Sequence, residues 1–312
     1  MLLREDNRIC KLLGTKYPLI QGGMAWVAES TLAAAVSNAG GAGLIAGGSA
    51  PIDYLRDQIR RAKELTDKPF GVNIMLMSPN AQDLAQLVID EKVPIVTTGA
   101  GNPGKFMEAW KNAGVKVIPV VPSVALAKRM ERAGADAVVA EGTESGGHID
   151  ENTTMCLVPQ VVDAVDIPVI AAGGIADGRG VAASFMLGAE GVQIGTRFLA
   201  SNECQIHETY KDLVINAKDT DNVVTGRTTG HPCRNVKTKF AKKLAADEMK
   251  GSITPEEFEN ITLGSLRKAV LDGNLDEGSF LCGLIAGMVN EIKPCSEIVE
   301  EIMTKAQELL NR

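Results

Sequence analysis

The sequence is poor in histidine, in aromatic residues and in positive charge, and it has no long apolar run. Its 312 residues include three histidines, 4% aromatic residues and a formal net charge of -7, whereas nucleic-acid-binding proteins usually carry a basic excess. No stretch approaches the roughly 18 consecutive apolar residues of a membrane span. The first ten residues carry charges where a signal peptide has an apolar core. These absences predict a cytoplasmic protein that binds neither nucleic acid nor membrane.

Closely spaced cysteines are also missing. The six cysteines are scattered, with no CxxC pair, whereas zinc sites and disulfide frameworks need recurring, closer spacings. We therefore expect reduced thiols and no bound metal. A Rossmann-type dinucleotide fingerprint is missing too, so we expect no separate dinucleotide-binding domain.

What the sequence does contain is a short apolar run that recurs eight times, each time followed by a helix-like segment. Successive runs start about 21 to 31 residues apart, the size of one βα unit. Their continuously apolar character is typical of strands that are covered on both faces. The predicted strands are residues 18–23, 42–48, 69–76, 94–101, 116–122, 137–142, 168–174 and 191–199.

Eight alternating strands and helices predict an α/β fold, a (β/α)8 TIM barrel, with functional groups at the C-terminal ends of its strands. A doubly wound open sheet is the alternative. We place the barrel in residues 1–200, completed by 276–312. Residues 201–275 are predicted to form a small helical lid domain, inserted after the eighth strand, that binds substrate.

Two stretches near the C-terminus have helix signals. Thr254 followed by Pro255 and Glu257 is typical of a helix start. Residues 294–310 have apolar residues at helical spacing, so we expect this helix to pack back onto the barrel.

The longest interval separates the sixth and seventh predicted strands, and its extra residues form the polar loop ESGGHIDENTT. His148 in this loop therefore lies on the face of the barrel where catalytic groups gather. A reference pKa near 6.5 allows histidine either protonation state at neutral pH. A histidine that only caps or packs the loop is the alternative. His207 and His231 fall in the predicted lid and receive no role from the sequence.

Two glycine loops follow the seventh and eighth strands, AAGGIADGRG and IGTRF. Barrels commonly hold a phosphate there, because bare backbone at Gly173, Gly174 and Gly195 and the hydroxyl of Thr196 can donate to it. A nucleotide, a sugar phosphate and a flavin mononucleotide all remain open. Asn73 on the third strand can bind the edge of a heterocycle or simply satisfy the end of its strand.

Longer stretches resemble the FMN-dependent enoyl-acyl-carrier-protein reductase II family. That family belongs with the nitronate monooxygenases, formerly called 2-nitropropane dioxygenases, in one flavin-barrel superfamily. The glycine loops and GGH are common to both, whereas the first three of the following stretches resemble the reductases more specifically. The similar stretches are QGGMAWVA, DKPFGVNIMLMSP, TTGAGNP, IPVVPSVALAKRMERAGADAVVAEGTESGGH and IPVIAAGGIADGRGVAASFMLGAEGVQIGTRF.

The resemblance implies a bound FMN, with His148 as the catalytic histidine beside it. It also implies NADH or NADPH as co-substrate, a response to a monovalent cation and a homodimer. One position departs from the pattern, since relatives often carry glutamine where this chain has Leu284. The implied FMN-binding residues are Gly22, Gly23, Met24, Ala25, Asn73, Glu141, Gly146, Gly147, Gly173, Gly174, Gln193, Gly195 and Thr196.

The implied activity is reduction of the trans-2 double bond of enoyl thioesters in bacterial type II fatty acid biosynthesis. The alternative is a nitronate monooxygenase, in which the same histidine would act as a base or substrate anchor. A phosphate-binding barrel of the inosine-monophosphate dehydrogenase kind needs a cysteine in a loop, but Cys156 falls in a predicted helix. A flavin-binding module without turnover is a non-enzymatic alternative.

Residues 222–246 contain no acidic residue, although the chain as a whole is acidic. An acyl carrier protein is acidic, so this local basic patch would help it dock. A solvated helix face with no partner is the alternative. The predicted docking residues are Arg227, Arg234, Lys237, Lys239, Lys242 and Lys243.

Overall fold

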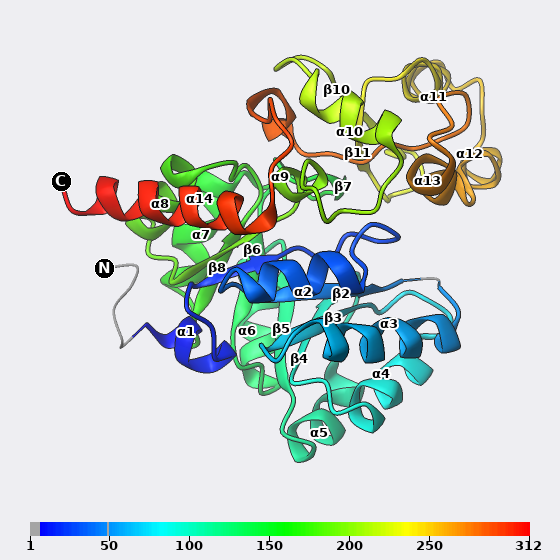
Figure 1. Cartoon of the computed structure of the whole chain (residues 1–312). Helices are drawn as coiled ribbons and strands as arrows, with labels where there is room; N and C mark the ends of the chain where they lie inside the picture. Colours follow the sequence, from blue (N-terminus) through cyan, green and yellow to red (C-terminus); the bar gives the residue numbers. More distant parts are fainter. Residues whose placement is uncertain (1–6, 49) are drawn as a thin grey trace.

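The computed structural model describes residues 7–48 and 50–312 and shows a parallel eight-stranded barrel (Figure 1). The strand order is β1-β9-β8-β6-β5-β4-β3-β2, and a parallel bridge between Ile20 and Ala42 joins the two ends of the sheet. The predicted barrel is therefore confirmed and the open sheet is excluded. The strands are β1 (Leu19–Gln21), β2 (Gly43–Gly47), β3 (Phe70–Met75), β4 (Ile95–Gly99), β5 (Lys116–Val121), β6 (Val138–Glu141), β8 (Val169–Ala172) and β9 (Gly191–Ile194).

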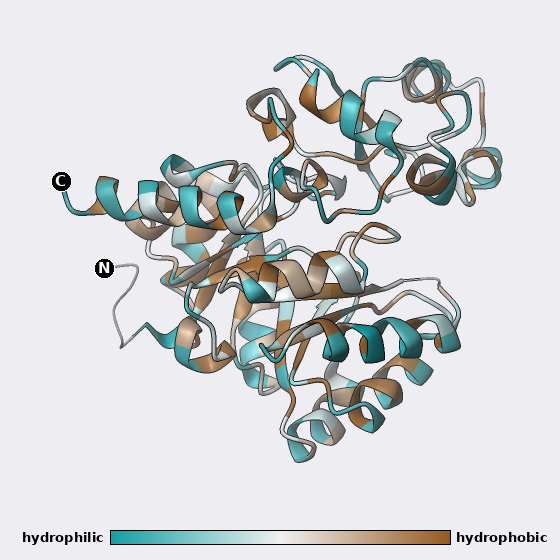
Figure 2. Cartoon of the chain, viewed as in Figure 1, coloured by the Kyte–Doolittle hydropathy of each residue, from teal (hydrophilic) through white to brown (hydrophobic). Residues whose placement is uncertain are grey.

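Amphipathic helices alternate with the strands and cover the outside of the barrel. In α3, for example, Leu55, Ile59 and Ala62 are buried, while charged residues occupy the outer face (Figure 2). This pattern turns the apolar stripe of each helix toward the sheet. The covering helices are α2 (Ser30–Asn38), α3 (Ile52–Leu65), α4 (Ala81–Asp90), α5 (Gly104–Asn112), α6 (Val124–Arg132), α7 (Thr154–Val162) and α8 (Gly178–Met186).

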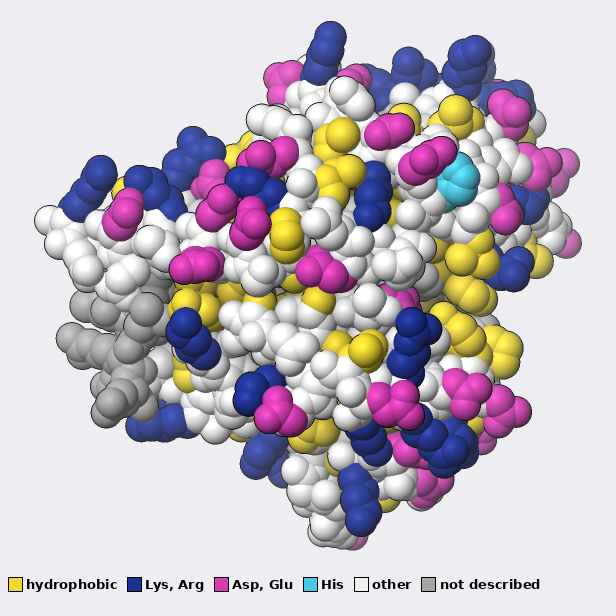
Figure 3. All heavy atoms as spheres, in the orientation of Figure 1, with side chains coloured by type: hydrophobic (Ala, Val, Ile, Leu, Met, Phe, Trp, Pro, Cys, Tyr) yellow, Lys and Arg dark blue, Asp and Glu magenta, His cyan; other side chains and the backbone are white. Residues whose placement is uncertain are grey.

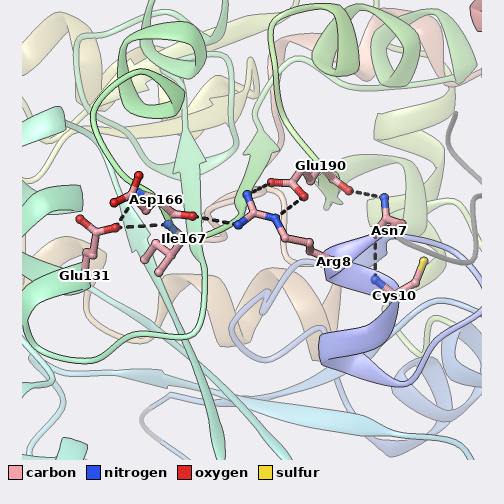
Figure 4. A network of polar contacts seen from close by, with 7 residues as sticks. All are labelled: Asn7, Arg8, Cys10, Glu131, Asp166, Ile167 and Glu190. Atoms are coloured by element: carbon pink, nitrogen blue, oxygen red, sulfur yellow. Dashed lines mark hydrogen bonds and ion pairs between the residues drawn. The ribbon is translucent and has the colours of Figure 1, made fainter.

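Helix α1 (Arg8–Leu13) closes the N-terminal end of the barrel. Its buried Ile9 and Leu13 join the apolar cluster inside the strands. Arg8 Nη1 donates to the carbonyl of Asp166 over 2.8 Å, and its guanidinium also pairs with Glu190, just ahead of β8 and β9 (Figure 4). Because this end is plugged, a ligand can enter the barrel mouth only from the C-terminal ends of the strands.

The segment after β9 lies over those C-terminal ends (Figure 1). Helix α12 (Pro255–Thr262) starts where predicted, and Thr254 and Glu257 form a capping box at its N-terminus. The helices of the segment after β9 are α9 (Thr196–Leu199), α10 (Glu208–Ile215), α11 (Lys239–Lys250), α12 (Pro255–Thr262), α13 (Ser265–Arg267) and the π-helix η1 (Lys268–Asp272).

This segment is not helical throughout, which corrects the prediction of a helical lid. Strands β10 (Asn222–Thr225) and β11 (Cys233–Val236) pair antiparallel, and β11 also pairs with β7 (Gly147–His148). The pairing of β11 with β7 joins residues more than 80 positions apart, which local helix and turn signals do not reveal. The histidine loop of the barrel is therefore part of a second, three-stranded sheet.

The chain then returns to the barrel through the 3-10 helix η2 (Leu284–Met288) and α14 (Cys295–Leu310). As predicted, α14 packs onto the barrel, against α8 and α2, where it completes the ring of helices (Figure 1). Its buried face includes Ile298, Ile302 and Met303. Among the described helices, none is both long enough and apolar enough to cross a membrane.

Candidate active site

A cavity of about 460 Å³ opens at the C-terminal ends of the strands, beneath the segment that follows β9. The loops after β1, β3, β6, β8 and β9 all contribute to its wall, together with residues 281–283. All thirteen residues that the resemblance assigns to FMN line this cavity, and so does His148. The structure thus brings the predicted site residues together, while their individual roles remain predictions.

Asn73 holds the loop after β1 in place. Its Nδ2 donates to the carbonyl of Gly23 over 3.3 Å, and its Oδ1 accepts from Thr97 Oγ1 over 2.8 Å. A Cβ added to Gly23 would lie 2.1 Å from the Asn73 Cβ, so only glycine fits this close approach. Asn73 therefore bonds within the protein and also lines the cavity, and its contact with a heterocycle remains a prediction.

The loop after β6 brings a carboxyl group and two glycines to the cavity. Burial raises the pKa of Glu141 to about 7, and the nearby Ser145 hydroxyl opposes that rise. A Cβ on Gly146 would lie 2.5 Å from the carbonyl carbon of Cys282, and Gly147 has a φ of 74°. Side chains at these two positions would fill the space or strain the backbone.

Arg234 on β11 braces this loop from the opposite side. Its Nη2 donates to the carbonyl of Thr143 over 2.9 Å, and its Nε donates to the carbonyl of Ser145 over 3.2 Å. The pairing of Arg234 with Gly147 and of Cys233 with His148 fixes the register. The planar guanidinium of arginine suits two neighbouring carbonyls, so the position of Arg234 indicates that it supports the loop after β6. The charge pattern of the sequence had instead grouped Arg234 with the docking residues.

Glu144 ties the same loop to α7 and to the loop after β8. Both of its carboxylate oxygens accept from the backbone N–H of Thr154, over 3.0 and 2.9 Å. The Thr154 hydroxyl lies within hydrogen-bonding distance of Glu144 Oε2 (2.8 Å) and of the carbonyl of Gly173 (3.0 Å). Glu144 also lines the cavity, and sequence reasoning missed it although it lies four residues before His148.

The loops after β8 and β9 supply the groups expected for a phosphate. Gly173 and Gly174 have φ values of 88° and 74°, so their backbone adopts a conformation that side chains disfavour. Thr196 Oγ1 accepts from the N–H of Gly283 over 2.8 Å, which leaves its own O–H proton free to donate. Gly195 adds bare backbone on the same side of the cavity.

One polar atom in the cavity wall has no partner of its own. Gln193 Oε1 is buried and has no hydrogen-bond partner among the described residues. A buried polar atom without a partner is destabilising, so this atom indicates a ligand with a complementary donor. Together with the glycine loops and Thr196, it fits a phosphate-bearing heterocycle such as FMN.

His148 faces the cavity from β7. The His148 residue is exposed at the cavity mouth, yet the protein packed around its ring lowers the pKa of His148, and the neighbouring His231 adds to this lowering. The two rings meet edge to face with centroids 6.4 Å apart. At neutral pH His148 is therefore biased toward the neutral form, which offers one N–H donor and one acceptor. His231 also lines the cavity, a role that sequence reasoning missed.

Two other residues bear on the sequence expectations. Leu284 is 40% exposed and lies outside the cavity wall, so the leucine at this position removes no polar group from the cavity. Cys156 is exposed on α7, away from the cavity. Cys282 does line the cavity, but burial raises its pKa to about 12, which disfavours a thiolate nucleophile.

The basic segment lies on the outer surface of the same region, where Figure 3 shows Lys and Arg side chains along the upper rim. Arg227, Lys237, Lys239 and Lys242 are exposed. Lys243 is exposed as well but pairs with Asp247 over 3.0 Å. Apart from Arg234, the predicted docking residues are thus accessible to a partner.

Comparison with known proteins agrees with this geometry. A family profile for nitronate monooxygenase matches residues 6–88 and 84–305. The chain belongs to the nitronate monooxygenase family. Members of this family are flavin enzymes that use FMN, so the protein is a flavin-dependent oxidoreductase.

Three full-length matches differ in their names. A probable nitronate monooxygenase of Staphylococcus saprophyticus is 36% identical and is matched over 99% of this chain and 100% of its own. A Mycobacterium tuberculosis protein named (3aS,4S,5R,7aS)-5-hydroxy-7a-methyl-1-oxo-octahydro-1H-indene-4-carboxyl-CoA dehydrogenase is 32% identical, with 97% of each chain covered. FabK from Thermotoga maritima is 52% identical in sequence. Its solved structure superimposes on this chain with a TM-score of 0.95, over 99% of this chain and 98% of the FabK chain.

Proposed function

We propose that the protein is an FMN-dependent enoyl-acyl-carrier-protein reductase that uses NADH or NADPH in bacterial type II fatty acid biosynthesis. The observation that carries the proposal is the 52% identity with FabK, an enoyl-acyl-carrier-protein reductase II, over nearly the whole chain. The monooxygenase relatives stand at 33 to 36% identity. That one relative is named as acting on a carboxyl-CoA also supports a thioester substrate.

Bound FMN would supply the hydride chemistry, the transfer of a hydride equivalent from NAD(P)H to the β-carbon of the enoyl thioester. Residues of the chain then have to bind the thioester and stabilise charge. Neutral His148 donates a hydrogen bond to the thioester oxygen, where negative charge develops as the β-carbon accepts hydride. A proton from solvent water, added at the α-carbon, completes the reduction of the double bond.

The cavity wall is suited to an acyl chain on one side and to polar groups on the other. Met75, Met77 and Leu266 line the side between β3 and the segment after β9. Glycine backbone and Thr196 form the opposite side. An enoyl chain can therefore lie against apolar surface while its thioester reaches His148.

An acidic acyl carrier protein is the proposed partner. The exposed cations Lys237, Lys239 and Lys242 lie in a segment without acidic residues, so they provide local attraction within an acidic protein. Reversing these three charges should raise KM for carrier-bound substrate much more than KM for the matching coenzyme A thioester. Equal increases for both substrates would contradict carrier docking at this surface.

The function is tested by measuring two activities in one FMN-loaded preparation. The first is NADH or NADPH oxidation with crotonyl-coenzyme A under anaerobic conditions, and the second is oxygen consumption with ethylnitronate. The proposal predicts that kcat/KM for the enoyl thioester exceeds that for the nitronate. The opposite ranking would establish nitronate monooxygenase, the candidate that the 36% identical relative favours.

A further inference from the structure

A buried hydroxyl group joins the histidine loop to the phosphate side of the cavity. Thr154 is the first residue of α7 and is 9% exposed. Its Oγ1 lies 2.8 Å from Glu144 Oε2, 3.0 Å from the carbonyl oxygen of Gly173 and 3.2 Å from that of Ala172. Thr154 does not line the cavity, but the other three residues do. The hydroxyl therefore stands directly behind the cavity wall.

The glycines around Thr154 make room for this contact. A Cβ on Gly142 would lie 2.1 Å from Thr154 Oγ1, and a Cβ on Gly173 would lie 3.0 Å from the same atom. A Cβ on Gly174 would lie 3.3 Å from the Glu144 Cβ. Because glycine permits such close approach, the loop after β6, the start of α7 and the loop after β8 meet at one hydroxyl group.

This hydroxyl has a single proton and three acceptor oxygens nearby. The proton is therefore shared between the Glu144 carboxylate and the Gly173 carbonyl in a bifurcated hydrogen bond. Without it, both oxygens would face the same space with no donor between them, and an acceptor left without its donor is destabilising. The Thr154 hydroxyl thus stabilises the position of the Gly173 carbonyl.

The orientation of this carbonyl sets the direction of the next N–H group. A trans peptide is planar, with its C=O and N–H pointing in opposite directions, so a Gly173 carbonyl held toward Thr154 turns the Gly174 N–H away from Thr154. Within the described part of the chain this N–H has no acceptor, and Gly174 lines the cavity. A free backbone N–H in a glycine loop is a donor suited to phosphate.

We propose that Thr154 is a positioning residue for the phosphate group of FMN, and that its hydroxyl gives the site a preference for FMN over riboflavin. Riboflavin has the same ring system and ribityl chain but no phosphate, so it does not use the Gly174 N–H. Thr154 acts through the Gly173 peptide and does not touch the flavin. The inference rests on the FMN of the proposed function and not on the enoyl thioester.

The test compares the Kd values of FMN and riboflavin for the flavin-free protein, both measured by quenching of flavin fluorescence. Thr154→Val keeps the branched side chain and removes the hydroxyl. A misdirected donor to a charged phosphate should raise the Kd for FMN about tenfold, while the Kd for riboflavin changes by less than about twofold. Equal losses of affinity for both flavins would overturn the inference, because the hydroxyl would then support the whole site and not the phosphate loop.

Two further variants separate the hydroxyl from the shape of the side chain. Thr154→Ser keeps the hydroxyl, so it should retain the preference for FMN; a loss as large as in Thr154→Val would contradict the role of the hydroxyl. Thr154→Ala removes the hydroxyl and leaves no misplaced methyl group. It should lose the preference as Thr154→Val does, and it decides the question if the valine variant does not fold.

Thr238→Val is the matched control. Thr238 is 7% exposed and caps α11 by accepting from the N–H of Ala241 over 3.1 Å, but it does not line the cavity. This variant should leave the ratio of the two Kd values unchanged, and a shift as large as in Thr154→Val would count against the inference. An FMN-loaded protein without enoyl reductase activity would contradict the proposed function, but the ratio would still decide on Thr154.

Discussion

Replacing Arg234 by methionine tests whether the second sheet organises the flavin site. The guanidinium makes two hydrogen bonds to the carbonyls of Thr143 and Ser145, and methionine keeps most of the apolar stem while removing both. The loop that it braces carries Gly146, Gly147 and His148. We expect this loop to loosen and the protein to bind FMN more weakly.

The magnitude follows from the half-buried position of the side chain. A hydrogen bond from a charged donor contributes about 1.5 to 3 kcal/mol when fully buried, and partial exposure to water reduces this to about 1 kcal/mol for each bond. Two such bonds amount to about 2 kcal/mol. If that energy orders the loop for the ligand, loss of both bonds weakens FMN binding about 10- to 30-fold.

The dissociation constant is measured by titrating flavin-free protein with FMN and following the quenching of flavin fluorescence. Arg132→Met is the control, because Arg132 is exposed at the end of α6 and lies outside the cavity wall. Arg234→Lys should fall in between, since one ammonium group cannot reproduce the planar two-carbonyl contact. An FMN affinity in Arg234→Met within twofold of the unmodified protein would refute the bracing role.

Three further substitutions test other parts of the site. His148→Ala should lower kcat for enoyl thioester reduction by about 100-fold or more while FMN stays bound; unchanged turnover by steady-state assay would remove His148 from the mechanism. Gly146→Ala should lose bound FMN or lower Tm by several degrees, because its Cβ would meet the Cys282 backbone at 2.5 Å; normal flavin content and Tm would show that the backbone yields there. Glu141 binds its proton more tightly in the folded protein, since burial raises its pKa from 4.5 to about 7. Its stabilising contribution is therefore complete below about pH 4.5 and is lost as pH rises through about 7, so Glu141→Gln should make the flavin-free protein about 1 to 3 kcal/mol more stable at pH 8 but not at pH 4.5. Denaturant unfolding at both pH values measures this, and the same difference at both would contradict the assignment.

The barrel and much of its cavity were predictable because their signals are local. Short apolar runs mark the strands, and the glycine loops follow them directly, so the C-terminal ends of neighbouring strands bring Gly173, Gly174, Gly195 and Thr196 together. The contribution of the segment after β9 could not be read in this way. Its strands are short, and Val223 and Val224 alone give little indication of a sheet.

The unpredicted site residues depend on contacts between distant positions. Arg234 binds carbonyls 89 and 91 residues earlier, and the charge pattern by itself indicated a surface role. His231 lies at the cavity because β11, which follows it, pairs with β7. Glu144 is different, since an acidic residue inside ESGGH was visible in the sequence, but its bond to Thr154 depends on how the loop folds back onto α7.

The central claim is most directly tested by anaerobic spectroscopy on the FMN-loaded protein. The flavin absorbance is recorded before and after addition of NADH or NADPH, and again after addition of crotonyl-coenzyme A. The account predicts loss of absorbance with the nicotinamide and recovery with the enoyl thioester in the absence of oxygen. A flavin that neither nucleotide bleaches, or that only oxygen restores, would contradict an enoyl reductase.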